Sequence, residues 1–348
     1  MFLNERTIPL NLQQIIAVRS RISKNHSKQP RLEKSELKSW AGYHGERTVD
    51  RLLEKFANNK YTIITDLNLQ AKKDDPFQID TFLYTSYFGL ILEIKNILGT
   101  LYFDKYSKQM IRTWNGEREG FQNPMLQAQM HQYHFQAWLN KHKIPPFPIV
   151  WLVVFSNPAT ILETTPGNEQ IFQKVIHTPL LLEKLLELEA KYTTPILDKS
   201  DSKRLNRLLL KENTPHLTNI LQKYEIPQID IKTGVRCAIC NYVPMLRVPA
   251  NWFCPNCNHY SKNAHIASLY DYFLINQSTI TNRQCREFLH IPTRSIALGL
   301  LSDLPLIGTK GGSTYQLSEL IKNPNEYFLL PKSKQLKGII PLPTEKPI

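Results

Sequence analysis

The chain has 348 residues, a formal net charge of +13 and a pI near 9.4, which allow two or three domains and favour a polyanionic partner, foremost nucleic acid. A merely basic protein is the alternative on charge alone. The first ten residues lack a signal-peptide core, and no apolar run approaches the roughly 18 residues of a membrane span. We therefore expect a cytoplasmic protein rather than a secreted or membrane-embedded one.

The chain opens with residues 1–38, which carry eight Lys or Arg against three acids and which we interpret as a basic N-terminal extension. Residues 39–157 then have the pattern of a compact α/β unit. Its first helix is expected over 45–58, where apolar residues recur at helical spacing, at Val49, Leu52, Leu53 and Phe56.

Strands dominate the next part of this unit. Apolar and β-branched runs predict strands over 61–69, 77–85 and 88–96, with shorter edge strands at 99–103 and 110–115. A helix is expected from Asn123-Pro124 to about Lys141, because proline is well placed in a first helical turn. The uninterrupted apolar run 148–156 is typical of a buried strand.

Two short acidic motifs stand thirteen residues apart on neighbouring predicted strands, Gln78-Ile79-Asp80 and Glu93-Ile94-Lys95. Residues two apart in a strand share a face, so Glu93 and Lys95 lie side by side among apolar neighbours, where unpaired charge is costly. Two carboxylates and the Ile94 carbonyl are ligands that Mg²⁺ accepts, and Lys95 would hold or deprotonate an attacking water or stabilise the phosphate. An ordinary Glu93–Lys95 ion pair is the alternative from spacing alone.

The surrounding motifs resemble those of the nuclease-related domain family (NERD), a branch of the restriction-endonuclease-like PD-(D/E)XK superfamily. They occur in the family's order and cover about a third of the chain: Gly42-Tyr43-His44-Gly45-Glu46, Gln78-Ile79-Asp80, Glu93-Ile94-Lys95-Asn96 with Gly99, and Asn123-Pro124-Met125-Leu126-Gln127. Ile79 stands where the superfamily name has proline, as in this branch. The resemblance implies an α/β (α+β) fold in which helices flank a central mixed sheet.

The resemblance also implies roles for five side chains. Asp80 and Glu93 would bind Mg²⁺ or Mn²⁺, and Lys95 would be the catalytic lysine. Glu46 would bind a second metal ion or orient water; a helix-start glutamate favoured by the helix dipole is the alternative. Gln127 would hydrogen-bond the substrate or Lys95, unless it is an exposed helix amide.

The helix that carries Gln127 has two histidines on the same stripe, His131 and His134. We interpret both as half-buried neighbours of the core, with a place in the active site as the less favoured reading. A second stripe of this helix is apolar and comprises Leu126, Met130, Tyr133 and Ala137.

Residues 158–231 have a helical pattern without recognisable chemistry and are interpreted as a helical connector. Residues 232–263 carry two C-x-x-C pairs separated by thirteen residues, a spacing typical of a zinc ribbon; the thiols are Cys237, Cys240, Cys254 and Cys257. Four sulfur ligands leave no open position, so we predict a structural Zn²⁺. A scaffold or protein-docking role for the module is the alternative to nucleic-acid contact. The fifth cysteine, Cys285, is expected to be a buried helix residue.

Residues 264–330 resemble a helix-turn-helix with a wing. Thr281 or Asn282 and Thr293 are suitable N-caps for two short helices, and 308–317 is a candidate wing. From Lys232 to the end there are thirteen basic against six acidic residues, which favours DNA binding over a protein-binding helical bundle. The Pro- and Lys-rich segment 331–348 is expected to be a loosely ordered tail.

Together these patterns predict a metal-dependent nuclease that hydrolyses DNA and is delivered by a zinc ribbon and a winged-helix-like module. A non-catalytic DNA-binding protein with the nuclease fold and an RNA-directed nuclease are the alternatives. Whether a homodimer is needed to cut both strands of a duplex stays open at this point.

Overall fold

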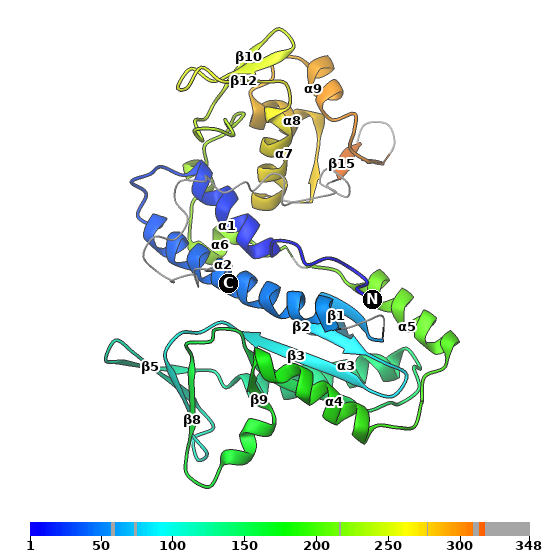
Figure 1. The fold of residues 1–348 in the computed structure, drawn as a ribbon. Helices are drawn as coiled ribbons and strands as arrows, with labels where there is room; N and C mark the ends of the chain where they lie inside the picture. The colour runs from blue at the N-terminus through cyan, green and yellow to red at the C-terminus, as the bar shows by residue number, and fades with distance from the viewer. Residues whose placement is uncertain (57–59, 73–74, 216, 277, 309–312, 317–348) are drawn as a thin grey trace, which may run out of the picture. The chain divides into compact units, whose positions relative to one another are not determined.

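The computed structural model describes the chain in six stretches, residues 1–56, 60–72, 75–215, 217–276, 278–308 and 313–316 (Figure 1). The chain divides into two compact units: one comprises Met1–Arg6 and Leu37–His216, and the other Thr7–Glu36 and Leu217–Ile348. The residues of the predicted N-terminal extension are thus shared between the units. The predicted tail, residues 331–348, lies outside the described residues.

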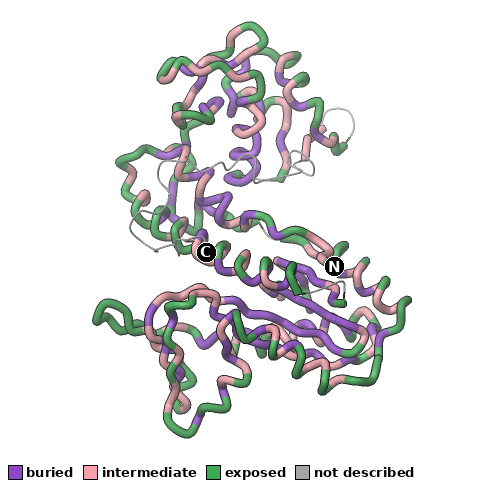
Figure 2. The backbone as a smooth tube through the Cα atoms, in the orientation of Figure 1, coloured by how far each residue is buried: buried purple, intermediate pink, exposed green. Residues whose placement is uncertain are grey.

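The first unit is built on a five-stranded mixed sheet, which confirms the predicted α/β class. Its order is β1 (Thr62–Lys72), β2 (Asp75–Tyr84), β3 (Gly89–Lys95), β7 (Ile149–Phe155) and β9 (Val175–His177). The first three strands are antiparallel, and β3, β7 and β9 are parallel. Strand β3 is buried along almost its whole length, as Figure 2 shows, which agrees with its largely apolar sequence.

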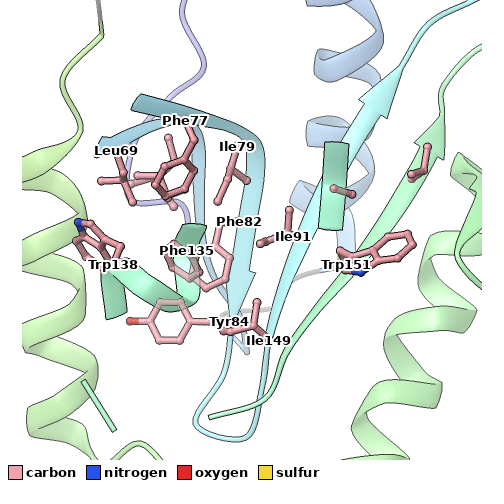
Figure 3. Close-up of a cluster of buried hydrophobic side chains, with 14 of the residues drawn as sticks. Leu69, Phe77, Ile79, Phe82, Tyr84, Ile91, Phe135, Trp138, Ile149 and Trp151 are labelled. Atoms are coloured by element: carbon pink, nitrogen blue, oxygen red, sulfur yellow. The ribbon is translucent and has the colours of Figure 1, made fainter. Parts of the chain in front are cut away.

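Helices cover both faces of this sheet. On one face, α2 (Gln29–Phe56) and α4 (Leu181–Lys191) share an apolar cluster with Leu90, Leu92 and Ile94 of β3. On the other face, α3 (Pro124–Lys141) and α5 (Lys199–Glu212) share a cluster with Ile91. Figure 3 shows Phe135 of α3 among these buried side chains. The alternation along β3 therefore directs Glu93 and Lys95 to the face that α3 covers.

A second, four-stranded sheet follows β3, in the order β6 (Glu117–Phe121), β5 (Met110–Trp114), β4 (Thr100–Phe103) and β8 (Ile161–Thr164). The stretch expected to be a helical connector adds β8 to this sheet and β9 to the first, with short 3-10 turns at Glu169–Gln173 and Thr178–Leu180, before its helices begin. Strands of three or four residues carry too little periodicity to be told from helix.

In the second unit, α1 (Leu10–Arg21) packs with α6 (Ile220–Tyr224) and α7 (Ala264–Ile275) around buried Ile15 and Leu274. A 3-10 turn, Gln228–Asp230, follows α6. Arg21 is fully buried, and its Nε donates to Asp271 Oδ2 at 2.9 Å.

The rest of the second unit combines the cysteine module with three helices. The cysteine module contains a small sheet of β10 (Leu246–Val248), β11 (Asn251–Phe253) and β12 (Tyr260–Ser261). It shares one apolar cluster with α7, α8 (Asn282–Leu289) and α9 (Arg294–Leu300). A fourth sheet has the order β13 (Thr279–Ile280), β15 (Thr314–Gln316), β14 (Leu306–Ile307).

Capping explains where the two short helices of this unit begin. The Thr281 hydroxyl accepts from Gln284 N–H, and the Gln284 side chain accepts from Thr281 N–H, which is a capping box at the start of α8. The Thr293 hydroxyl accepts from Ile296 N–H at the start of α9. No helix in the described part of the chain is long and apolar enough to span a membrane.

Candidate active site and metal centre

The two acidic motifs meet where strands β2 and β3 part. Their ladder ends at the pair Thr81–Leu92, and beyond it Ile94 N–H donates to Asp80 Oδ2 at 2.8 Å. A side-chain carboxylate thus replaces the next ladder acceptor. Because the N–H and C=O of one strand residue point to the same edge, the Ile94 carbonyl faces the edge where Asp80 lies.

Strands β1 and β2 are irregular at the same level. Ile64 and Leu67 of β1 are three residues apart yet belong to the same apolar cluster, as do Ile79 and Phe82 of β2. In a regular strand such residues would lie on opposite faces. Asp66, which is opposite Asp80 in the register, has a φ of +49°, and the reversal of side-chain direction occurs at this pair.

Glu93 is the most buried acid of the site, with no exposed surface. Its Oε1 accepts from Lys95 Nζ at 2.5 Å, and Lys95 Nζ also donates to Gln127 Oε1 at 3.2 Å. Its Oε2 lies 3.2 Å from His131 Nδ1, but neither atom makes a hydrogen bond within the described residues. One buried carboxylate oxygen is therefore left for a cation or a water.

The start of α3 fixes Gln127 in this position. Asn123 Oδ1 accepts from Met125 N–H at 2.9 Å, and Asn123 Nδ2 donates to the Lys108 carbonyl at 2.9 Å. Pro124 then occupies the first helical turn, where its missing N–H has no cost. The Asn-Pro motif accordingly ties the helix start to the chain before β5, with Gln127 one turn later.

Close packing of α2 on β3 positions Glu46. A Cβ atom on Gly45 would lie 2.6 Å from both Asn96 Cβ and Ser156 Oγ, so the helix can approach this closely only at a glycine. Asn96 Nδ2 also donates to the Ala41 carbonyl at 2.7 Å. The Gly-Tyr-His-Gly-Glu motif is thereby a packing device that brings Glu46 to the end of the sheet.

Arg6 joins the acids on this side, which sequence reasoning did not anticipate. Its side chain is fully buried, and its Nη1 donates to Glu46 Oε2 at 2.7 Å and to Asp66 Oδ1 at 3.1 Å. Its Nε donates to Asp50 Oδ2 at 2.8 Å, and its Nη2 donates to the Asp80 carbonyl at 2.8 Å. We call Arg6, Glu46, Asp50 and Asp66 the Arg6 cluster.

Burial and like charge shift the protonation of the site. Burial, and then the neighbouring Glu93 carboxylate, raise the pKa of Asp80 to about 7. Burial, and then Asp80, raise the pKa of Glu46 to about 8. Burial alone would lower the pKa of Lys95, but the carboxylates of Glu93 and Asp80 raise it above its ordinary value. The lysine is accordingly a cation, whereas the Asp80 and Glu46 carboxyl groups keep their protons to a higher pH than ordinary carboxyl groups do.

Comparison with known proteins assigns this part of the chain. Residues 41–156 match the sequence profile of the nuclease-related domain. The chain carries a nuclease-related domain. An uncharacterized protein of Bacillus anthracis is 25% identical over 112 residues, which are 32% of this chain and 52% of that protein. The chain thus spans about half the length of the curated relative it matches. No solved structure matches the chain.

Within the nuclease-related domain, four of the five predicted site residues converge, and the fifth, Glu46, lies in the adjoining Arg6 cluster. Asp80, Glu93, Lys95 and Gln127 come together, and His131 joins them against expectation. His134 instead faces Asp75, with its Nε2 3.8 Å from Oδ2.

The apolar stripe of α3 does not face the core: Leu126, Met130 and Tyr133 are exposed. The sequence signal for His131 was its position one helical turn after Gln127 on one stripe.

The donor set of the nuclease-related domain fits a hard divalent cation. Asp80 and Glu93 offer carboxylate oxygens, the Ile94 carbonyl lies on the same edge, and Glu93 Oε2 is buried without a hydrogen bond from any described residue. The donor atoms of these acids lie farther apart than the sulfur atoms of the four cysteines. Across the described stretches, the four cysteines are the group of metal-ligating side chains whose donor atoms lie within 4.8 Å of one another.

The four cysteines form this cluster from two similar turns. Cys237 and Cys254 each accept at their carbonyl from the N–H four residues later, and both of those residues are asparagines with positive φ, Asn241 and Asn258.

Sulfur–sulfur distances are 3.6 Å for Cys237–Cys257 and 3.5 Å for Cys240–Cys254, far longer than a disulfide. A tetrahedral Zn²⁺ with Zn–S bonds of about 2.3 Å separates its sulfurs by about 3.8 Å, so the cluster fits that ion.

Proposed function

We propose that the chain is a divalent-metal-dependent nuclease that hydrolyses phosphodiester bonds of DNA. The observation that carries the proposal is the buried oxygen of Glu93, free of hydrogen bonds from the described residues, beside Asp80 and Lys95 at the end of the central sheet. A buried carboxylate oxygen without a hydrogen bond is costly, and a bound cation would compensate it. The match of residues 41–156 to the nuclease-related domain supports the same reading.

Asp80, Glu93 and the Ile94 carbonyl would hold Mg²⁺ or Mn²⁺. When bound, such an ion supplies Lewis-acid polarisation of a phosphoryl oxygen and a water of lowered pKa. Three oxygen donors from the protein suit an ion such as Mg²⁺, which keeps several bound waters.

Lys95 carries the remaining chemistry of the site. As a cation it would stabilise charge that develops on the phosphoryl oxygens. Gln127 would position Lys95 by accepting a hydrogen bond from its Nζ. His131, whose Nδ1 lies 3.2 Å from Glu93 Oε2, would fix the orientation of the Glu93 carboxylate. Glu46 would orient water or hold a further ion, the two roles that the family resemblance implies.

The second unit would deliver the nuclease to DNA. The cysteine cluster would hold one structural Zn²⁺. The succession α7, β13, α8, α9, β14, β15 suits a winged-helix-like module, with α9 presenting exposed Arg294 and Ser295. The net positive charge supports a nucleic-acid partner. We place the activity in the cytoplasm, where thiols stay reduced.

A cleavage assay tests the nuclease proposal. Purified protein is incubated with supercoiled, linear duplex and single-stranded DNA in Mg²⁺, Mn²⁺ or EDTA. Metal-dependent cleavage is expected, and Lys95→Ala should reduce it by about 100-fold or more, as loss of a positioned proton donor or charge does. Lys174→Ala is the matched control, because Lys174 is also half-buried but lies over the Trp151 ring, 5.1 Å from its centroid.

Two other outcomes would redirect the proposal. Wild-type cleavage no greater than that of Lys95→Ala, together with retained DNA binding, would favour a non-catalytic DNA-binding protein. Cleavage of single-stranded RNA in preference to every DNA form would favour an RNA-directed nuclease. Light scattering of the active species would show whether a homodimer is the cutting form.

A further inference from the structure

Arg6 has the environment of a bound cation. Its guanidinium carries five N–H groups, and all three of its nitrogens donate to oxygen. Three acceptors are carboxylates, those of Glu46, Asp50 and Asp66. Beyond the carbonyl of Asp80, its Nη2 also donates to the Thr81 hydroxyl at 2.7 Å.

The acids of the Arg6 cluster need this charge. Three carboxyl groups surround one guanidinium in a place with little solvent, where each of them is stabilised by that fixed positive charge. Arg47 approaches the cluster from outside: its side chain is 30% exposed, and its Nη1 lies 3.6 Å from Asp50 Oδ2. Arg6 is fully buried and contacts all three acids, whereas of these three Arg47 contacts Asp50.

The Arg6 cluster adjoins the proposed metal ligands. Arg6 contacts the backbone of Asp80, whose own carboxylate is bonded to Ile94 N–H. A second catalytic ion would lie about 3.5–4 Å from the first and would need further carboxylate oxygens. Glu46 is the acid that the sequence motif supplies for that purpose, and one of its oxygens is already bonded to Arg6.

We propose that Arg6 is a built-in cation that takes the place of a second metal ion, so that the nuclease centre binds a single divalent ion. The inference rests on the proposed function, because it assumes a first ion held by Asp80 and Glu93. Arg6 is then a positioning residue: it holds Glu46 and the middle of β2 at Asp80 and Thr81, and it supplies fixed charge that does not exchange with solvent.

Calorimetric titration with Mn²⁺ tests this inference without reference to activity. The full-length chain is first supplied with stoichiometric Zn²⁺, so that the cysteine cluster is filled. Wild-type protein is expected to bind one Mn²⁺ with a mononuclear electron paramagnetic resonance spectrum. Arg6→Met is expected to bind two, with a spin-coupled spectrum. Arg47→Met, the matched arginine at the outer side of Asp50, should still bind one.

Each other result decides between the two proposals. Two ions in wild-type protein, or one ion in a folded Arg6→Met variant, would overturn the role of Arg6 and leave the metal-dependent nuclease standing. No ion in wild-type protein would overturn the metal-dependent nuclease and this inference with it. Because Arg6→Met leaves buried acids without their cation, the double variant Arg6→Met with Asp50→Asn is measured as well. Circular dichroism checks that each variant is folded. The wild-type measurement requires no substitution and decides by itself whether the native centre is mononuclear.

Discussion

At the scale of single residues, Asp80 belongs to two charged groups at once. Its backbone carbonyl accepts from Arg6, and its carboxylate accepts from Ile94 beside Glu93 and Lys95. Helix α2 supplies the acids on one side, and α3 supplies the partners of Lys95 on the other. A change at Asp80 therefore affects both the Arg6 cluster and the proposed ligand pair.

The raised pKa of Asp80 predicts how stability depends on pH. The folded protein binds this proton with a pKa of about 7, whereas an unfolded Asp has a pKa of about 3.9. Between these values the folded state holds more protons, so the free energy of unfolding falls as the pH rises. Asp80→Asn removes this loss and can still accept from Ile94. In buffer without Mg²⁺ or Mn²⁺, we expect its stability relative to wild type to increase between pH 5 and pH 8, by about 1–3 kcal/mol.

Urea denaturation at both pH values measures this difference. Asp104→Asn is a control of opposite sign, because hydrogen bonds from the Ser107 hydroxyl and from nearby backbone N–H groups lower the pKa of Asp104. The Asp104 carboxylate therefore stabilises the folded protein above its unfolded pKa, and this stabilisation is lost as the pH falls. Asp104→Asn should lower the free energy of unfolding at neutral pH and leave it unchanged in acid. An Asp80→Asn difference that stays constant from pH 5 to pH 8 would contradict the raised pKa.

The site residues that spacing alone identified are close along the chain, whereas Glu46 and Gln127 were identified through the family resemblance. Asp80 and Glu93 sit on strands joined by a short turn, so their meeting follows from strand alternation and antiparallel pairing. Arg6 reaches Asp50 and Asp80 across 44 and 74 residues, and no local pattern encodes such a contact. The one available signal was that Asp50 lies one helical turn after Glu46, which suggests two acids on one face.

At the scale of elements, the packing of α2 on β3 depends on one glycine. Gly45 and Gly42 lie on the same helix and differ only in what a side chain would meet. A Cβ at Gly45 would lie 2.6 Å from Asn96 and Ser156, whereas a Cβ at Gly42 has nothing within 4 Å. The two glycines therefore separate packing from helix propensity.

We expect alanine to have opposite effects at these two positions. Gly42→Ala should stabilise the protein by about 0.5–1 kcal/mol, because alanine loses less conformational entropy in a helix. Gly45→Ala should destabilise it by about 1–3 kcal/mol, because the helix must move away from the sheet. The free energies of unfolding in urea measure both. Stabilisation by Gly45→Ala would show that the helix does not pack this closely.

The cysteine cluster is the element whose stability we expect to depend on metal. Cys254→Ala should abolish zinc binding and unfold the sheet around buried Trp252, because a module this small has little other core. Cys285→Ala is the control, since Cys285 is equally buried but lies outside the cluster. Metal analysis by mass spectrometry should find one zinc per chain in wild type and Cys285→Ala and none in Cys254→Ala. Zinc in equal amounts in both variants would refute the site.

At the scale of the whole molecule, the two units are interleaved in sequence. Residues 7–36 belong with the C-terminal unit, where Gln14 Nε2 donates to the Leu274 carbonyl and Arg21 pairs with Asp271, across 260 and 250 residues. The sequence indicated a basic extension here because charge and helical patches are local properties. Its attachment to a distant core is a property of the fold that periodicity does not report.

Two N-terminal deletions should therefore fail in different ways. Removing residues 1–6 takes Arg6 from the acids of the first unit and leaves α1 and the cysteine module intact. It should lower the stability of the nuclease-related domain, by about 3–5 kcal/mol for the buried ion pairs lost, without loss of zinc. Removing residues 1–38 also takes α1 and its buried Ile15 and Arg21 from the second unit, so zinc content and helical circular dichroism should both fall. If the longer deletion kept full zinc and the stability of the shorter one, residues 7–36 would be an appendage and not part of the second core.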